Sequence, residues 1–284
     1  MQKKAAIITG ASSGIGRATA LAFARSGYAV ALAARRAQLL ADLADACHRH
    51  GAEAVAVPTD VACEPQVEDL VSACVERFGR VDVMVNNAGY GLHARVHQTT
   101  TEQMHRIFGT NFYGVFFGCR AVAPVMIRQG AGHIFNVSSV IGKRGAPFNG
   151  AYCATKFAVC GLTDAMRVEM LDHNVRVTSV CPGLTDTAFF ESGQGLRPGG
   201  KSSFARLRGL TPPDVVARRI VATVGKNIPE LVFSTGGKLL TLIAALSPRL
   251  ADWMMARYHA DLVRSTAARA DEAKSPATKP RENL

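Results

Sequence analysis

The chain has 284 residues, 48% of them apolar and 19% charged, which is typical of a folded globular protein and excludes a largely disordered one. Its formal net charge of +11 suits an anionic ligand, nucleic acid or anionic lipid. We expect no nucleic-acid module, because there is no Lys/Arg block or zinc-finger spacing, and no membrane-spanning helix, because no apolar run approaches roughly 18 residues.

Short aliphatic runs alternate along the chain with longer segments of helical periodicity. Strands are predicted at residues 5–9, 29–33, 54–57, 81–85, 133–137, 175–180 and 230–233. Helices are predicted between them, for example at residues 38–50, where Leu39, Leu43 and Ala46 recur at helical spacing. Crossovers between parallel strands are right-handed and place helices on both faces. The predicted fold is therefore α/β, a doubly wound Rossmann-type parallel sheet that binds ligands at the carboxyl ends of its strands.

The chain continues beyond the last predicted strand. Helices are predicted at residues 238–246 and 251–263, divided by Ser247-Pro248, since serine caps helix N-termini and proline fits the first helical turn. No repeat or linker divides the chain. We expect a single domain over residues 1–269, with a helical extension at about 237–266, and a mobile polar tail over residues 270–284.

The predicted terminal helices carry apolar residues at helical spacing, namely Leu239, Ile243, Leu246, Leu250, Trp253 or Met254, and Tyr258, flanked by Arg249, Arg257 and Arg264. Such a face can pack on its own domain, on a second subunit or on a lipid surface, in that order of structural plausibility. We therefore expect a homodimer or homotetramer, with peripheral membrane contact as the third option.

A glycine-rich turn follows the first predicted strand. Its sequence is Gly10-Ala11-Ser12-Ser13-Gly14-Ile15-Gly16, and a helical pattern starts at once after it. Glycines let the backbone approach a pyrophosphate, while free N–H groups and the positive end of the helix dipole stabilise its charge. A strand, turn and helix in this order predict a dinucleotide site.

Tyr152 and Lys156 stand four residues apart at the start of another helical segment, so they share one helix face. An adjacent ammonium stabilises a phenolate and lowers the pKa of the phenol from about 10. The pair can therefore exchange a proton with an alcohol or carbonyl oxygen. Cys153 is interpreted as a packing residue rather than a nucleophile.

These two motifs resemble those of the short-chain dehydrogenase/reductase family, and the resemblance covers roughly the first 190 residues. Further matching positions are Asp60-Val61 at the adenine contact, Asn86-Asn87-Ala88-Gly89 beside the cofactor, Asn111, Ser139, and a segment that lines the nicotinamide, with Pro182, Gly183, Thr185 and Thr187.

The resemblance implies an oxidoreductase that moves a hydride between nicotinamide and a carbonyl or alcohol carbon. It implies that Tyr152 is the general acid/base, and that Lys156 lowers the pKa of Tyr152 and binds the nicotinamide ribose. It also implies that Ser139 orients the substrate and that Asn111 links Lys156 to solvent through water.

In that family the residues after the second strand report cofactor choice. Here they are Ala33-Ala34-Arg35-Arg36, with no carboxylate for the ribose of NAD and with guanidinium groups able to pair with a 2′-phosphate. We expect NADP(H), with Arg35 as the principal contact and Ser12 or Arg36 assisting.

Residues 185–210 correspond to the substrate lid of family members. Phe189, Phe190, Phe204 and Leu207 in this segment indicate a lipophilic ketone or alcohol. Two alternatives are a 3-oxoacyl thioester reductase and a non-catalytic NADP(H)-binding sensor or scaffold.

The seven cysteines lack any Cys-x-x-Cys, which indicates a reducing, cytoplasmic setting. His93 and His97 have the spacing of a helical metal pair, but no third ligand is suggested. We interpret them as loop or surface residues and expect no metal site.

Overall fold

The computed structural model describes residues 3–183, 194–195 and 211–274. Seven parallel strands form one sheet in the order β3-β2-β1-β4-β6-β7-β9. They are β1 (Ala5–Thr9), β2 (Ala29–Ala34), β3 (Ala54–Pro58), β4 (Val83–Asn86), β6 (Gly132–Val137), β7 (Val175–Cys181) and β9 (Glu230–Val232). The predicted doubly wound sheet is confirmed. The direction of winding reverses between β1 and β4, which is where such sheets bind their ligands.

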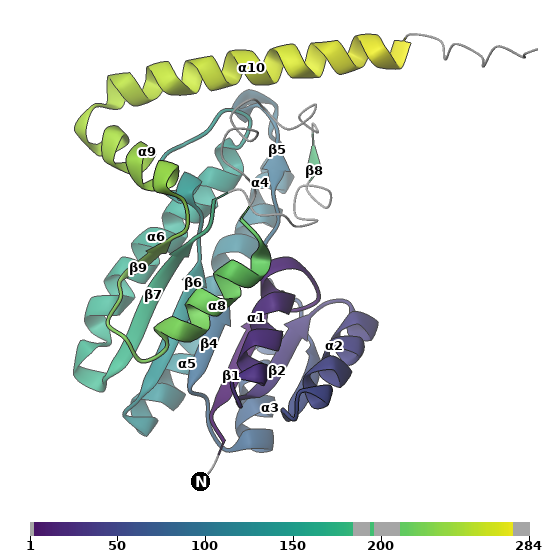
Figure 1. Ribbon diagram of the computed structural model, residues 1–284, viewed down its shortest axis with the longest axis vertical. Coiled ribbons are helices and arrows are strands. Elements are labelled where there is room, and N and C mark those ends of the chain that lie inside the picture. The colour runs from purple at the N-terminus through teal and green to yellow at the C-terminus, as the bar shows by residue number, and fades with distance from the viewer. Residues whose placement is uncertain (1–2, 184–193, 196–210, 275–284) are drawn as a thin grey trace, which may run out of the picture.

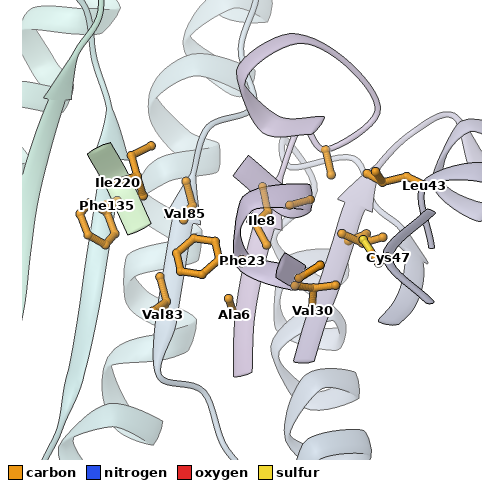
Figure 2. Packing of buried hydrophobic residues seen from close by; sticks show 14 of the residues in the cluster. Ala6, Ile8, Phe23, Val30, Leu43, Cys47, Val83, Val85, Phe135 and Ile220 are labelled. Carbon is orange, nitrogen blue, oxygen red and sulfur yellow. The ribbon is translucent and has the colours of Figure 1, made fainter. Parts of the chain in front are cut away.

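Helices cover both faces of this sheet (Figure 1). One face carries α1 (Gly14–Arg25), α2 (Ala37–Arg49) and α8 (Pro213–Thr223), and the other carries α3 (Glu64–Phe78), α5 (Gly114–Gln129) and α6 (Gly150–Glu169). Figure 2 shows Ile8 and Val85 of neighbouring strands beside Phe23 of α1. All five residues of β1 and all six of β2 are buried, because helices lie on both sides of these strands.

Smaller elements complete the carboxyl-end side of the sheet. They are β5 (Leu92–His93), which pairs with β8 (Gln194–Gly195), α4 (Thr101–Phe108), a π-helical turn at Gly109–Tyr113, and single 3-10 turns at Val96–Gln98 and Val140–Gly142. Another 3-10 turn, at Leu171–His173, leads into the amino end of β7. A capping box of Thr100 and Gln103 starts α4, because each side chain accepts a hydrogen bond from the backbone N–H of the other residue.

The fourth strand starts two residues later than predicted. The backbone N–H of Val81 donates to the side-chain oxygen of Gln129 at 3.0 Å, and the amide of the same side chain donates to the Val81 carbonyl at 2.8 Å. A side chain of α5 therefore occupies the backbone groups of Val81, and regular pairing of β4 begins at Val83.

Two helices follow the last strand, α9 (Thr235–Leu246) and α10 (Pro248–Lys274). The Ser247 hydroxyl accepts a hydrogen bond from Leu250 N at 3.4 Å, so the predicted division at Ser247-Pro248 is confirmed. Helix α10 continues past the predicted end at residue 263, because residues 264–274 are rich in alanine, the strongest helix former. Of the tail expected over 270–284, residues 270–274 are thus helical and 275–284 lie outside the described residues.

Helix α10 crosses the carboxyl-end side of the sheet (Figure 1). Its Asp252 pairs with Arg144, and its His259 ring stacks on Phe148 with the ring centroids 5.3 Å apart. The Arg95 guanidinium also lies over Phe148, 5.4 Å from the ring centroid. These contacts tie α10 to the segment that leads into α6. Among the described residues, none of the helices has the length and apolarity that crossing a membrane requires.

Candidate active site

The glycine turn between β1 and α1 leaves room for a ligand to contact the protein backbone. Gly10 and Gly14 have φ of +65° and +55°, in the left-handed region that favours glycine. A Cβ on Gly16 would lie 2.3 Å from the Gly10 carbonyl oxygen, so only glycine fits there. Ser13 precedes the first turn of α1 but its side chain does not cap it, so the N–H groups of that turn remain available to an anion.

A guanidinium lies on this turn, and it belongs to Arg36. Its Nη2 donates to Ser12 Oγ at 2.8 Å and to Ser13 Oγ at 3.2 Å. Arg35, the principal candidate from the sequence, is exposed and lines the same cleft. The structure therefore brings both arginines and both serines together, with Arg36 in direct contact with the turn.

Thr9 joins β1 to the end of β4. Its hydroxyl oxygen accepts hydrogen bonds from Asn87 N at 2.9 Å and Ala88 N at 3.1 Å, and the Asn87 side-chain amide donates to the Thr9 carbonyl at 2.9 Å. A Cβ on Gly10 would lie 2.8 Å from Ala88 Cα. The Asn87–Gly89 segment is thus held against the glycine turn.

Three polar side chains meet where β6 ends and α6 begins. Ser139, Tyr152 and Lys156 are all buried. The Lys156 Nζ donates to the Val137 carbonyl at 2.8 Å and lies 5.7 Å from the centroid of the Tyr152 ring. The Ser139 hydroxyl accepts from Ile141 N at 3.3 Å and donates to the Pro182 carbonyl at 3.5 Å.

The pKa values of this group are set mainly by burial. Burial raises the pKa of Tyr152 above its ordinary value of 10, and the influence of the nearby Ser139 hydroxyl only partly offsets this. Burial also lowers the pKa of Lys156 to about 8. The sequence led us to expect the opposite direction for Tyr152. The reason for the difference is that the phenol is desolvated, while the ammonium is bonded to a carbonyl rather than to the phenol.

Asn111 lies in the π-helical turn and is fully buried. Its Nδ2 donates to the Tyr90 carbonyl at 2.9 Å and its Oδ1 accepts from Tyr90 N at 3.0 Å. A Cβ on Gly89 would lie 3.1 Å from Asn111 Oδ1 and 3.6 Å from Lys156 Nζ. Asn111 and Lys156 therefore approach the same glycine from two sides.

Two supporting residues were missed by the sequence interpretation. The Ser138 hydroxyl donates to the Lys156 carbonyl at 2.9 Å, and the Thr155 hydroxyl donates to the Tyr152 carbonyl at 2.7 Å. Asn111 Nδ2 also donates to Thr155 Oγ1 at 3.3 Å. The sequence signal for Ser138 was its position next to Ser139 at the end of a predicted strand. Nothing in the sequence pointed to Thr155.

One cleft of about 930 Å³ connects these parts, within the usual size range of ligand pockets. Its lining runs from the glycine turn and both arginines, past Asp60 and Val61, to the tyrosine and lysine; the predicted residues on it are Gly10, Ser12, Ser13, Gly14, Ile15, Arg35, Arg36, Asp60, Val61, Asn87, Ala88, Gly89, Ser139, Tyr152, Lys156, Pro182 and Gly183. Gly16 and Asn111 lie behind this lining. Thr185, Thr187 and nearly all of the expected lid at 185–210 lie outside the described residues.

The two histidines considered as a metal pair do not share a helix. His93 is buried in β5, which pairs with β8 and lies against α6, so the expected loop or surface position was wrong. Burial lowers the pKa of His93. His97 is in the exposed 3-10 turn at Val96–Gln98. In the described part of the chain, no group of three His, Cys, Asp or Glu side chains is placed to hold a metal ion.

Comparisons with known proteins agree with this architecture. The uncharacterized oxidoreductase YxnA of Bacillus subtilis is 33% identical over 258 residues, covering 89% of this chain and 72% of that protein. The alcohol dehydrogenase of Thermococcus sibiricus, solved with 5-hydroxy-NADP, has a TM-score of 0.73 and 34% identity over 82% of this chain and 97% of its own. A short-chain dehydrogenase/reductase of Burkholderia phymatum, solved with NAD, has a TM-score of 0.79 and 29% identity over 88% of this chain and 95% of its own.

The family profile described as short chain dehydrogenase matches residues 4–194, more than half of the chain. This match agrees with the seven-stranded parallel sheet and with the relatives above. The chain therefore belongs to the short-chain dehydrogenase/reductase family of nicotinamide-dependent oxidoreductases.

Proposed function

We propose that the chain is an NADP(H)-dependent oxidoreductase that transfers hydride reversibly between nicotinamide and the carbon of a carbonyl or secondary alcohol, acting on a lipophilic substrate. One observation carries the proposal: a single cleft leads from the glycine turn with its arginines to the buried Ser139, Tyr152 and Lys156.

The residues at the glycine turn suit a phosphorylated dinucleotide. A Cβ on Gly16 would collide with the backbone of Gly10, so the turn is shaped for close approach, and the first turn of α1 offers N–H groups. Arg36, held by Ser12 and Ser13, supplies a cation where a 2′-phosphate would bind, with Arg35 beside it. The backbone of Asn87–Gly89 and of Pro182-Gly183 would hold the rest of the dinucleotide.

Bound nicotinamide supplies the hydride or accepts it. Tyr152 is the proton donor to the substrate oxygen, and its raised pKa keeps the phenol protonated at neutral pH, the form that carbonyl reduction needs. Ser139, which lines the same cleft as that phenol, orients the same substrate oxygen. Lys156 is cationic below about pH 8 and would bind the nicotinamide ribose. Asn111 stabilises the Tyr90 backbone and, through water, would connect Lys156 to solvent.

Turnover is tested with NADPH and a panel of lipophilic ketones, aldehydes and acetoacetyl-CoA, measuring loss of NADPH absorbance. We expect Tyr152→Phe to lower kcat by at least about 10²-fold and to leave NADPH affinity unchanged. Tyr28→Phe is the control, since Tyr28 directly precedes the amino end of β2, does not line the cleft, and packs on Phe23.

An active Tyr152→Phe enzyme would refute the proton donor. Tight NADPH binding without turnover of any compound would favour the sensor alternative. Reduction of acetoacetyl-CoA alone would favour the thioester reductase.

Cofactor preference is tested by comparing NADPH and NADH affinities of Arg36→Ala, Arg35→Ala and the control Arg49→Ala at the far end of α2. Losing a charge-assisted hydrogen bond to phosphate costs roughly 10- to 100-fold in affinity. We expect Arg36→Ala to lose this much NADPH affinity with little change for NADH. If neither arginine variant changes the ratio of the two affinities, the NADP(H) assignment is wrong.

A further inference from the structure

Five large apolar side chains are exposed on the last two helices, around the corner at Ser247-Pro248. They are Leu239 (52% exposed), Leu242 (55%), Leu246 (77%), Leu250 (46%) and Trp253 (53%), and we call them the corner surface. Spacings of three and four residues place the three leucines on one face of α9, and Leu250 and Trp253 on one face of α10. This is a larger exposed apolar group than scattered surface residues produce.

The other sides of both helices already have partners. Leu240 of α9 and Ala251 and Leu262 of α10 are buried, and His259 stacks on Phe148. Tyr258, which the sequence pattern grouped with the apolar stripe, is partly buried on this inner side. The corner surface therefore faces away from the domain.

Cations lie beside the corner surface and further along α10. Lys238, Arg249, Arg257 and Arg264 are exposed, and the Arg257 guanidinium lies 3.9 Å from the centroid of a Trp253 ring. Among the ion pairs formed by the described residues, none includes any of these four. Helix α9 has no carboxylate and α10 has four, Asp252, Asp261, Asp271 and Glu272, of which Asp252 is paired with Arg144.

We propose that the corner surface docks the protein on an anionic lipid bilayer. An apolar helix face bordered by Lys and Arg, with tryptophan among its residues, is the pattern that binds at the lipid–water boundary, where anionic headgroups attract each nearby cation. A second copy of the chain is the less suitable occupant. A two-fold symmetric contact would bring together the same surface of both copies, so the exposed cations of both would gather at one interface, which is electrostatically unfavourable. The proposal does not depend on which reaction the cleft performs.

Trp253 gives a direct probe, because it is the only tryptophan in the chain. The full-length protein is mixed with vesicles of phosphatidylcholine alone or with phosphatidylserine added, some containing brominated lipid. We expect a blue shift of Trp253 fluorescence and quenching by brominated lipid with the anionic vesicles only, and weaker binding at high salt. Equal binding to both compositions, or no quenching, overturns the proposal.

Two variants separate the apolar and the charged contributions, each with a matched control. Leu246→Glu/Leu250→Glu should lower vesicle binding roughly tenfold or more, while Val168→Glu/Leu171→Glu, at positions 67% and 60% exposed on the main body, should not. Arg249→Glu/Arg257→Glu should lower it roughly thirtyfold or more, while Arg49→Glu/Arg128→Glu should have a smaller effect. Circular dichroism confirms that each variant is folded.

Sedimentation velocity without lipid tests the competing occupant. If the wild-type protein is a dimer that Leu246→Glu/Leu250→Glu dissociates, and Trp253 is not quenched by lipid, the corner surface is a subunit interface and the lipid proposal is wrong. We expect the oligomeric state to be the same in both proteins.

Discussion

Lys156 carries an ammonium in a buried site, and replacing it with methionine should change how stability depends on pH. Its pKa is about 8 in the folded protein against an ordinary value of 10.5. Between these values the unfolded chain holds a proton that the folded chain has released, so stability rises with pH. The burial cost is fully present below about pH 8 and is lost as pH approaches 10.5.

The size of the effect follows from the shift. A difference of about 2.5 pKa units corresponds to about 3 kcal/mol, of which roughly 2 to 3 kcal/mol is recovered between pH 7 and pH 10. Lys156→Met keeps the length of the side chain without the charge. The free energy of unfolding of the wild type, minus that of the variant, should therefore increase by this amount over the interval.

Urea denaturation followed by circular dichroism at several pH values measures this difference. Titrations of other groups are common to both proteins and largely cancel. If the difference between their free energies of unfolding stays constant from pH 7 to pH 10, the buried ammonium is not desolvated as the structure indicates.

Three further predictions concern stability. Gly118→Ala should destabilise the protein by several kcal/mol, because the added Cβ would lie 2.1 Å from Asn86 Oδ1. Gly161→Ala, also inside a helix but with open space around the added Cβ, should stabilise the protein by roughly 0.5–1 kcal/mol. Thermal unfolding of both variants separates the effect of packing from that of helix propensity. Thr9→Val should cost about 2–3 kcal/mol, since it leaves two backbone N–H groups of the Asn87 segment without their acceptor, and an unchanged midpoint in urea would contradict this. Burial lowers the pKa of His133 from 6.5 to about 3, so protonation of His133 should lower the free energy of unfolding as pH falls through that range, by about 3 kcal/mol at pH 4. His133→Gln should therefore lose less stability than the wild type in acid denaturation. An equal loss of stability in both proteins would show that His133 is not responsible.

The fold was predictable because its signals are local. Strands buried on both faces have nearly continuous aliphatic sequences, as in residues 5–9 and 29–34, and parallel connections allow few topologies. The start of β4 was not predictable, because it depends on a hydrogen bond with Gln129, which is distant in sequence. The length of α10 was underestimated because the polar tail was interpreted from its prolines rather than from its alanines.

The candidate site was predictable where a spacing fixes geometry and less so where long side chains choose between partners. Tyr152 and Lys156 had to share a helix face, and the strand ends had to meet at one edge of the sheet. Whether Arg35 or Arg36 would bond to Ser12 and Ser13 depends on rotamers of exposed side chains, which the sequence does not encode simply. The direction of the Tyr152 pKa depends on how much burial outweighs charge, and only the packed structure gives this balance.

The contacts of Arg144 and Phe148 with α10 have a mechanical consequence. These two residues lie between Ser139 and Tyr152 in the chain, so a terminal helix far away in sequence braces the span on which the proton donor and its hydroxyl partner are aligned. A bilayer bound to the corner surface would restrain α10 and, through it, the relative positions of Ser139 and Tyr152. The turnover rate would then change when vesicles are added, even with a substrate that is freely dissolved in water.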